Sequence, residues 1–417
     1  MKPAHRYVMF IVFLTSLIAI LSISFFAAIF AIANNNRIVY GVYVDNIKLS
    51  SLSRENAAQL LTEQTCNTFS DKTIALTYND KKWKLTPAEI DLSIDIEKTV
   101  DAAFSVGRSH SIITNALETF HSALYGHPIN LVSHYNHVLL KNKLASIDTA
   151  LTIQSKSAAC YIDNSGHIKS TPAIVGKKLD MDAATASLSA DLQKLKLPRQ
   201  LELPVLEEQP TVTNEDLENI DTVLAVYSSS FSNNNSNRSQ NIRIAAEALD
   251  QTLLRPETVV SFNNTVGKRV ASAGYKDAAV ILDGKIAQDV GGGVCQVSST
   301  LYNAILLAGL TSVERTAHFY PSSYVPMGRD ATVADGQIDF RFRNPFPHNA
   351  YLLSKVYGGM LTIYILGNHE DLRDYALTTN IEKPSPGAVV SVYRILRKNG
   401  HELQHEFLHT DHYDIEE

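Results

Sequence analysis

Three residues in the second half of the chain have types and an order suited to nucleophilic chemistry. Cys295 supplies a thiol, His318 follows it, and Asp330 comes next. A cysteine nucleophile needs a histidine that withdraws the thiol proton or stabilises the thiolate, and a carboxylate that fixes the imidazole tautomer. One hypothesis is therefore a thiol enzyme in which Cys295 is the nucleophile, His318 is the base, and Asp330 or Asp339 orients that base. His348 is an alternative base.

The thiol follows three consecutive glycines, at positions 291–293, and precedes a segment with helical spacing. An ordered glycine loses more backbone freedom than any other residue, so such a run suits a sharp turn or a close backbone approach. Apolar side chains at Val297, Leu301 and Ile305 predict a helix that Gly309 ends. Cys295 should then lie at or just before the helix N-terminus, where unpaired amides and the macrodipole lower the pKa of a thiol.

We expect residues that contact a ligand to surround this thiol. Gln296, or backbone amides beside Cys295, could stabilise an oxyanion. The predicted binding residues lie in the glycine run, in the helix and beside Asp330: Gly291, Gly292, Gly293, Gln296, Ser299 and Arg329. Neither a metal nor another cofactor is predicted.

Each chemical assignment has a structural alternative. Free cysteines are commonly buried and inert, so Cys295 could fill space beneath the glycine loop. His318 could have its hydrogen bonds satisfied within the fold, and Asp330 beside Arg329 could be a turn carboxylate or part of an ion pair. Under this alternative, the chain is a binding or scaffolding protein rather than an enzyme.

The elements that must position these residues are short. Residues 313–318 predict a strand that delivers His318, and residues 337–344 alternate in polarity as a strand does. Asn241 is expected to cap a helix over residues 242–253.

A second motif near the C-terminus, His401-Glu402-Leu403-Gln404-His405, matches H-E-x-x-H. Zinc proteases need both histidines on one helical face. Here Asn399-Gly400 directly precedes the motif and predicts a hairpin turn, so residues 401–409 should form a strand. On a strand the two histidines would be ~13 Å apart, too far to share one zinc ion. A metalloprotease is therefore discounted.

The N-terminal region predicts the compartment. Residues 7–33 carry no charge, a run longer than the ~20 residues that span a bilayer. Lys2 and Arg6 precede the run and Arg37 follows it, which places the N-terminus in the cytoplasm and the rest outside. We expect a single-pass membrane protein, and a cleaved signal peptide ending near residues 31–33 is the alternative.

Composition and cysteine count restrict the class further. The chain has 417 residues, with 37 Lys+Arg against 43 Asp+Glu and a net charge of −6. No excess of positive charge exists for a nucleic-acid partner. The three cysteines are too few for a disulfide scaffold, although Cys66 and Cys160 could pair outside the cell.

The expected fold class is α+β. We predict a cytoplasmic stub and transmembrane anchor at 1–36 and small α+β modules, possibly two, at 37–209. A mixed α+β domain should occupy 215–370 and a C-terminal β-hairpin 371–417. Ser53 and Asp180 are candidate N-caps within the modules.

The domain at 215–370 resembles the VanW family, named for its occurrence beside vancomycin-resistance genes. The resemblance rests on residues 227–232, 241–246, 262–263 with 266–267, 274–275, 291–303, 314–315 with His318, and 328–331. Residues 41–45 with 57–61, and 174–180, resemble the peptidoglycan-binding modules of Gram-positive wall proteins, and the C-terminal hairpin resembles part of a G5 module. The resemblance implies a cell-envelope protein with peptidoglycan as its partner, but it supplies no established reaction. The thiol enzyme would therefore act on peptidoglycan peptide stems.

Overall fold

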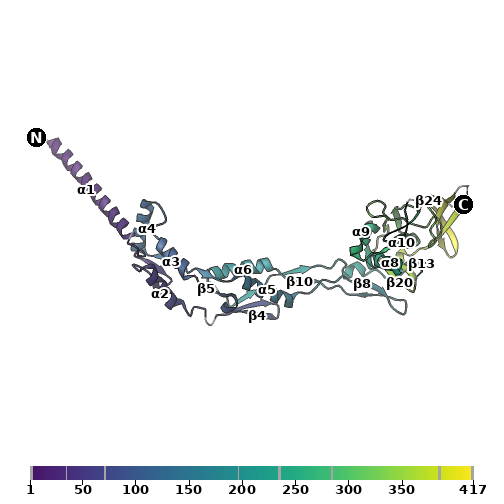
Figure 1. Cartoon of the computed structure of the whole chain (residues 1–417), viewed down its shortest axis with the longest axis horizontal. Coiled ribbons are helices and arrows are strands. Elements are labelled where there is room, and N and C mark those ends of the chain that lie inside the picture. The colour runs from purple at the N-terminus through teal and green to yellow at the C-terminus, as the bar shows by residue number, and fades with distance from the viewer. Residues whose placement is uncertain are drawn as a thin grey trace. The chain divides into compact units, whose positions relative to one another are not determined.

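The computed structural model of the chain is described here for residues 3–33, 35–69, 72–195, 197–232, 236–282, 285–383 and 387–414. It divides into two compact units, each formed by two segments (Figure 1). The N-terminal unit contains Met1–Gln154 and Gly176–Glu208, and the C-terminal unit contains Ser155–Val175 and Gln209–Glu417. Helices and strands are mixed in both units, which confirms the predicted α+β class.

The N-terminal unit begins with a long apolar helix, α1 (Pro3–Ala33). Its segment Tyr7–Phe26 has a mean hydropathy of 2.6 and is long enough to cross a membrane. A signal sequence close to the N-terminus would meet the same criterion.

Two small cores make up the rest of the N-terminal unit. In the first, α2 (Arg54–Thr65) and α3 (Ile96–Ser105) pack together beside a sheet ordered β2-β1-β6, and α4 (Ile112–Tyr125) follows. These strands are β1 (Val42–Val44), β2 (Ile47–Lys48) and β6 (His127–Ile129). Ser53 accepts a hydrogen bond from the Asn56 amide at 3.2 Å, which confirms the predicted N-cap of α2.

In the second core, α5 (His137–Leu151) and α6 (Met181–Gln193) pack together around buried leucines such as Leu140, Leu144 and Leu188. Asp180 accepts from the Ala183 amide at 3.0 Å, as predicted for the N-cap of α6. The strands and the short 3-10 helix of this region are β3 (Ile74–Tyr78), β4 (Lys81–Leu85), η1 (Pro87–Ile90), β5 (Ser93–Ile94), β7 (Ser133–His134), β10 (Gly176–Leu179), β11 (Gln200–Glu202) and β12 (Val205–Glu208).

The C-terminal unit is built on an antiparallel sheet ordered β13-β21-β20-β14. Its strands are β13 (Thr222–Ser230), β14 (Thr252–Leu254), β20 (Ala350–Tyr357) and β21 (Met360–Gly367). Helices α8 (Ser236–Leu249) and α10 (Val294–Leu307) contact this sheet and each other. Twelve of the residues of α10 are buried, so this helix is the centre of the core.

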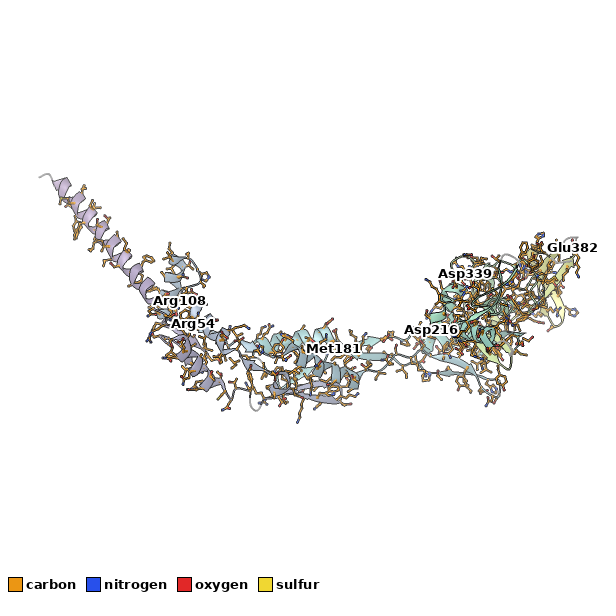
Figure 2. All side chains as sticks on the ribbon, in the orientation of Figure 1. Arg54, Arg108, Met181, Asp216, Asp339 and Glu382 are labelled. Carbon is orange, nitrogen blue, oxygen red and sulfur yellow. The ribbon has the colours of Figure 1, made fainter. Side chains whose placement is uncertain are left out.

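Smaller sheets complete the unit. A sheet ordered β22-β23-β24 contains β22 (Asp374–Glu382), β23 (Ala388–Lys398) and β24 (His401–Tyr413). The other elements are β8 (Ala159–Ile162), β9 (Ile168–Thr171), α7 (Asn214–Leu217), β15 (Val259–Ser261), α9 (Phe262–Val266), η2 (Ala271–Ala273), β16 (Asp277–Leu282), β17 (Lys285–Val290), β18 (Thr311–Glu314), β19 (Arg341–Arg343) and η3 (His369–Asp371). Figure 2 shows the side chains on this framework.

Three expectations about these elements are wrong in position. Asn241 lies inside α8 rather than at its N-cap, because its buried amide donates to the Lys276 and Gly292 carbonyls. The strand expected at 313–318 ends at Glu314, so His318 lies in a loop. The strand expected at 337–344 is only Arg341–Arg343.

Candidate functional site

Cys295 is the second residue of α10, so the predicted position at a helix N-terminus is confirmed. The glycines before Cys295 allow the backbone to pass close to neighbouring elements where the helix begins. Gly293 has φ +109°, and a Cβ atom there would lie 3.0 Å from side-chain atoms of Arg238 and Ile242. A Cβ atom on Gly292 would lie 2.7 Å from the Ala279 carbonyl oxygen. The glycine run therefore packs against α8 and β16, which no larger residue permits.

His318 is held by Asp330 through two hydrogen bonds. Its Nδ1 atom lies 2.5 Å from Asp330 Oδ2, and its backbone N–H donates to the same oxygen at 2.6 Å. Because an ionised carboxylate only accepts, Nδ1 must carry a proton. The Nε2 atom, 3.4 Å from the Tyr324 hydroxyl oxygen, belongs to the ring that forms a side-chain hydrogen bond with Cys295. The structure thus brings Cys295, His318 and Asp330 together in the order that a cysteine nucleophile requires.

The pKa values of Cys295 and His318 are shifted by the groups around them. Burial alone would raise the pKa of the Cys295 thiol, but the hydrogen bond and charge of His318, with the Val333 backbone and Arg269, lower it. Burial lowers the pKa of His318, but the hydrogen bonds to Asp330 and Cys295 outweigh burial and raise it to about 9. Both shifts favour a thiolate at Cys295 and an imidazolium at His318.

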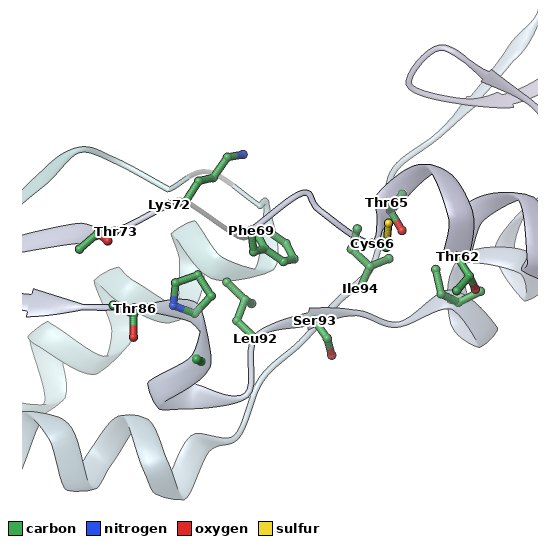
Figure 3. Close-up of a pocket in the computed structure, with 13 residues that line it drawn as sticks. Thr62, Thr65, Cys66, Phe69, Lys72, Thr73, Thr86, Leu92, Ser93 and Ile94 are labelled. Atoms are coloured by element: carbon green, nitrogen blue, oxygen red, sulfur yellow. The ribbon is translucent and has the colours of Figure 1, made fainter.

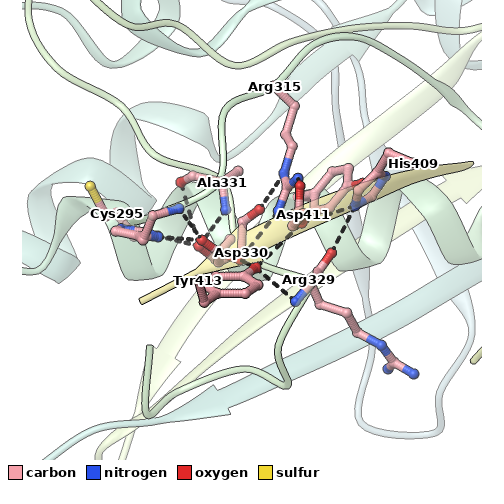
Figure 4. A network of polar contacts seen from close by, with 12 residues as sticks. Cys295, Arg315, Arg329, Asp330, Ala331, His409, Asp411 and Tyr413 are labelled. Atoms are coloured by element: carbon pink, nitrogen blue, oxygen red, sulfur yellow. Dashed lines mark hydrogen bonds and ion pairs between the residues drawn. The ribbon is translucent and has the colours of Figure 1, made fainter. Parts of the chain in front are cut away.

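Asp330 is the charged centre that sustains this state. Its side chain is 1% exposed, and it accepts from Arg315 Nη2 at 3.2 Å and from the Tyr413 hydroxyl (Figure 4). Burial would raise the pKa of Asp330, but the His318 hydrogen bond and the Arg315 charge lower it to about 2. A buried carboxylate with this many donors stays ionised and fixes the imidazole.

Strand β24 supplies side chains that hold Asp330 and its partner Arg315. Asp411 accepts from Arg315 Nη1 at 2.6 Å, and His409 Nε2 lies 3.2 Å from the other Asp411 oxygen. The Tyr413 hydroxyl, which donates to Asp330, also accepts from the Gly328 amide at 2.8 Å. His409, Asp411 and Tyr413 occupy alternate positions of β24, so they share one face of the strand.

The polar residues that follow Cys295 hold the loop of Asp330 against α10. Ser298 donates to the Ala331 carbonyl at 2.5 Å, and Ser299 accepts from the Ala331 amide at 2.9 Å. Asn303 donates to the Arg329 carbonyl at 2.7 Å. Ser299 also donates to the Cys295 carbonyl at 2.7 Å, so one hydroxyl links the thiol residue to the loop of its carboxylate.

Like Ser299, the predicted binding residues Gln296 and Arg329 have hydrogen-bond partners within the fold. The Gln296 amide donates to Ser229 and to the Ser230 carbonyl, both at 2.9 Å, and its oxygen accepts from Arg238 at 2.8 Å. Arg329 donates to the Leu377 carbonyl at 2.6 Å. Ligand contact stays a prediction for Gly291, Gly292, Gly293, Gln296, Ser299 and Arg329.

The alternative acid–base residues lie in other surroundings. Asp339 accepts from the Ser261 hydroxyl at 2.5 Å and from the Asn263 amide at 2.9 Å, so it stabilises the start of α9. His348 Nδ1 lies 3.1 Å from Asp371. The partner of His318 is therefore Asp330, which decides between the two carboxylates left open by the sequence.

Several residues of the site were missed by the sequence reasoning: Arg238, Arg269, Arg315, Tyr324, Asp411 and Tyr413. The available signal for β24 was the spacing of His409, Asp411 and Tyr413. Alternate positions of a strand share one face, so this spacing places three polar side chains together. Tyr324 lies in a loop, and no periodic pattern marks it.

The H-E-x-x-H motif lies on β24, which confirms the predicted strand. Within the described ranges, no cluster of three or more His, Cys, Asp or Glu side chains is placed to hold a metal ion. Cys66, Cys160 and Cys295 are all free thiols, so the structure contains no Cys66–Cys160 disulfide.

A separate cleft of about 530 Å³ lies in the N-terminal unit, beside the end of α2 (Figure 3). Several of its hydroxyls are committed: Thr62 and Thr65 donate to carbonyls of their own helix, and Thr86 bonds Glu89. Lys72 and Cys66 are its ionisable side chains, while the rest of the lining is hydroxyl-bearing or apolar. This lining suits binding better than acid–base chemistry, because it lacks a positioned proton acceptor.

Two stretches of the chain match known protein families. Residues 237–366 match the family described as "VanW like protein", and residues 83–199 match the family described as "Putative peptidoglycan binding domain". The chain therefore contains a VanW-like domain and a region that matches the putative peptidoglycan-binding domain, which confirms the two family resemblances and supports a wall-associated protein. Residues 41–45 and 57–61 lie outside the second match. The matched VanW-like stretch includes Cys295, His318 and Asp330 but ends before β24.

Two known proteins are similar to part of this chain. The chain is 43% identical over 167 residues to "Uncharacterized protein YoaR" of Bacillus subtilis (strain 168), covering 40% of this chain and 55% of that protein. It is 34% identical over 113 residues to "Vancomycin B-type resistance protein VanW" of Enterococcus faecalis (strain ATCC 700802 / V583), covering 26% and 41%. The chain thus matches about half the length of these relatives. No solved structure matches it.

Proposed function

We propose that this chain is a wall-associated thiol enzyme that acts on amide bonds in the peptides of peptidoglycan. The observation that carries the proposal is the alignment of Cys295, His318 and Asp330 beside a helix N-terminus, with the thiol pKa lowered and the imidazole pKa raised. The peptidoglycan-binding match at residues 83–199 supports the substrate class.

The first chemical step is acyl transfer to the thiol. Cys295 Sγ attacks the carbonyl carbon of the amide, and the C–N bond breaks as the His318 imidazolium gives its proton to the leaving amine. The products are an S-acyl enzyme, a neutral His318 and a free amine. Because the Gln296 side chain donates to Ser229 and Ser230, and the Val294 and Gln296 backbone amides donate to Gly291 and Gly293, the Cys295 backbone amide is the better donor for the oxyanion.

The second step releases the acyl group. His318 takes a proton from water or from an acceptor amine, and that nucleophile attacks the thioester carbon. The C–S bond breaks, and Cys295 leaves as a thiolate that pairs again with the imidazolium. Water as acceptor gives hydrolysis of a stem peptide, and an amine as acceptor gives a new cross-link.

A non-catalytic wall-binding protein is the second candidate, and one contact favours it. The Cys295 thiol lies 3.5 Å from the Val333 carbonyl oxygen, a geometry in which a protonated thiol donates a weak hydrogen bond. In this case Cys295 is a packing residue, and the polar residues of α10 serve only to hold the loop of Asp330.

Purified sacculi separate the two candidates. The chain and its Cys295→Ser variant would be incubated with Gram-positive sacculi, and the muropeptides compared by mass spectrometry, with Cys160→Ser as the matched control. We expect changed cross-links or shortened stems with the wild type and Cys160→Ser, but not with Cys295→Ser. Unchanged muropeptides, with every protein retained on the sacculi, would overturn the enzyme and support the binding protein.

We also propose that α1 is retained as a single membrane anchor, with the N-terminus in the cytoplasm and both units outside. The apolar segment Tyr7–Phe26 and the absence of charge through residue 33 support this orientation. Intact-mass analysis of the chain from membranes tests it. A mass that lacks the first 33 residues would show a cleaved signal peptide instead.

A further inference from the structure

Helix α4 has the reverse of the usual side-chain arrangement. Its large apolar side chains point outward and are between 46% and 75% exposed: Ile112, Ile113, Leu117, Phe120, Leu124 and Tyr125. A surface helix of a soluble protein instead turns such residues toward the core. An exposed apolar face of this kind marks a surface that another phase or molecule covers.

The inward face of α4 is small and polar, and it is firmly packed. Ala116, Thr119 and Ser122 are its buried residues, spaced three apart along one side of the helix. Ser122 donates to the Tyr40 carbonyl at 2.9 Å, and a Cβ atom on Gly41 would lie 1.9 Å from the Ser122 carbonyl oxygen. The helix therefore cannot rotate its apolar face inward without losing this close packing.

The apolar face of α4 contacts the C-terminal part of the apolar helix α1. The rings of Phe120 and Phe25 meet edge to face with centroids 5.7 Å apart. Phe25 lies in the C-terminal part of the uncharged run of residues 7–33. Because this run is longer than the ~20 residues that span the hydrocarbon core, its C-terminal part reaches the outer boundary of that core, and the contact with Phe25 places α4 beside it.

The composition of α4 also suits that level. The helix contains no Lys or Arg, and its one acidic side chain, Glu118, accepts from the Gly107 amide at 2.8 Å. Tyr125 and His121 are the ring-bearing polar residues of the exposed end, and aromatic residues of this kind favour the membrane interface.

We propose that α4 lies on the outer surface of the lipid bilayer, with its apolar face in the boundary between headgroups and acyl chains. The contact rests on α1 as a retained anchor but is independent of the chemistry at Cys295. With α1 it forms a two-helix attachment, which restricts the tilt of the N-terminal unit against the membrane. Loss of thiol activity and loss of this contact are therefore separate outcomes.

Tryptophan fluorescence in vesicles tests the proposal with the full chain. Trp83 is the chain's single tryptophan, so a Trp83→Phe background removes other signals. Leu124→Trp reports on α4, Tyr125→Trp is a second reporter, and Val138→Trp is the matched control because Val138 is 65% exposed on α5. Each protein would be reconstituted into phosphatidylcholine–phosphatidylglycerol vesicles with and without brominated acyl chains, and floated to isolate the bound fraction.

We expect brominated lipid to quench the tryptophan at 124 or 125 more than about twofold and to leave that at 138 almost unchanged. Equal quenching at 124 and 138 would overturn the proposal. So would a tryptophan at 124 that is shielded from aqueous quenchers but not quenched by lipid, because a second protein would then cover α4. A chain that fails to float would remove the anchor on which the contact depends and would overturn it as well.

Discussion

Two thiols of the C-terminal unit show opposite responses to burial. Cys160, on β8, is 2% exposed among apolar neighbours, and burial raises its pKa to about 11. Cys295 is also desolvated, yet its pKa is lowered because an imidazolium and a guanidinium face it. Burial by itself makes a thiol inert, whereas burial beside cations that are already ordered makes it a nucleophile.

The ordering of those cations has a visible origin. His318 is aligned by Asp330, Asp330 is held by Arg315 and Tyr413, and Arg315 is held by Asp411. The surroundings of Cys160 contain no comparable chain among the described residues, since its cluster is made of apolar side chains and Tyr351. The difference between the two thiols therefore depends on His318, which contacts the Cys295 sulfur, and on the side chains that hold His318 in place.

The largest expected effect is the difference in alkylation rate between the two thiols. At pH 7 we expect iodoacetamide to modify Cys295 at least about 1,000-fold faster than Cys160 in the folded chain, since reactivity follows the thiolate fraction and exposure. Peptide mass spectrometry over a time course measures both rates in one sample. Similar slow rates would remove the distinction and support the packing role of Cys295.

Removal of the Asp330 charge should make the surroundings of Cys295 more like those of Cys160. Asp330→Asn leaves Arg315 and His318 without their shared carboxylate, and we expect a loss of about 3–5 kcal/mol in the free energy of unfolding. Urea unfolding measures this loss. Asp339→Asn removes a carboxylate that accepts three hydrogen bonds, from Ser261, Asn263 and Phe340, and that forms no ion pair among the described residues, so it should cost clearly less.

Replacement of His318 tests the imidazolium directly. In His318→Gln the pKa of Cys295 should rise, and we expect labelling at pH 7 to fall by roughly 10–100-fold. His348→Gln is the matched control, because His348 also pairs with an aspartate but lies in other surroundings. An equal effect of both changes would indicate a general loss of structure rather than a role of the imidazolium.

The free energy of unfolding should depend on pH through the shifted pKa values of His318 and Asp330. The pKa of His318 is raised to about 9 from 6.5, so its contribution is full below pH 6.5 and is lost as pH rises through about 9. The pKa of Asp330 is lowered to about 2 from 3.8, so its contribution is present above pH 3.8 and is lost as pH falls toward 2. Urea unfolding from pH 6 to 10 should show a smaller loss of stability in His318→Gln than in the wild type.

The smallest expected effect concerns one hydroxyl. Tyr413→Phe removes a donor to Asp330 and leaves the ring in place, and we expect a loss of about 1 kcal/mol. The alkylation rate of Cys295 should fall only slightly, because Arg315 still holds the carboxylate. A decrease as large as that in His318→Gln would show that the hydroxyl, not the guanidinium, is the main support of Asp330.

The sequence predicted the fold best where local chemistry dominates. The N-caps at Ser53 and Asp180, the helix that begins beside Cys295 and the hairpin at Asn399-Gly400 all depend on neighbouring residues. Asn241 was misplaced because its amide bonds to distant backbone, at Lys276 and Gly292, and not to its own helix. A residue type favoured at caps was thus used for tertiary contact.

The candidate site was predictable in its three principal residues and not in their support. Cys295, His318 and Asp330 carry recognisable chemistry in an informative order. Asp411 and Tyr413 reach Asp330 through strand pairing and packing across more than 80 positions of sequence, as the separation of 83 between Tyr413 and Asp330 shows. Pairing over such distances is decided by the whole fold, so periodicity within one segment cannot reveal it.

The position of Tyr413, 83 residues after Asp330, has a consequence for biosynthesis. A ribosome releases Cys295, His318 and Asp330 well before β24, so a growing chain lacks the strand that completes the support of Asp330. The hydrogen bond from Tyr413 to Asp330 and the ion pair of Asp411 with Arg315 form only after β24 has been made and has paired with β23. During synthesis, the thiol at position 295 is thus made well before the strand that supports Asp330.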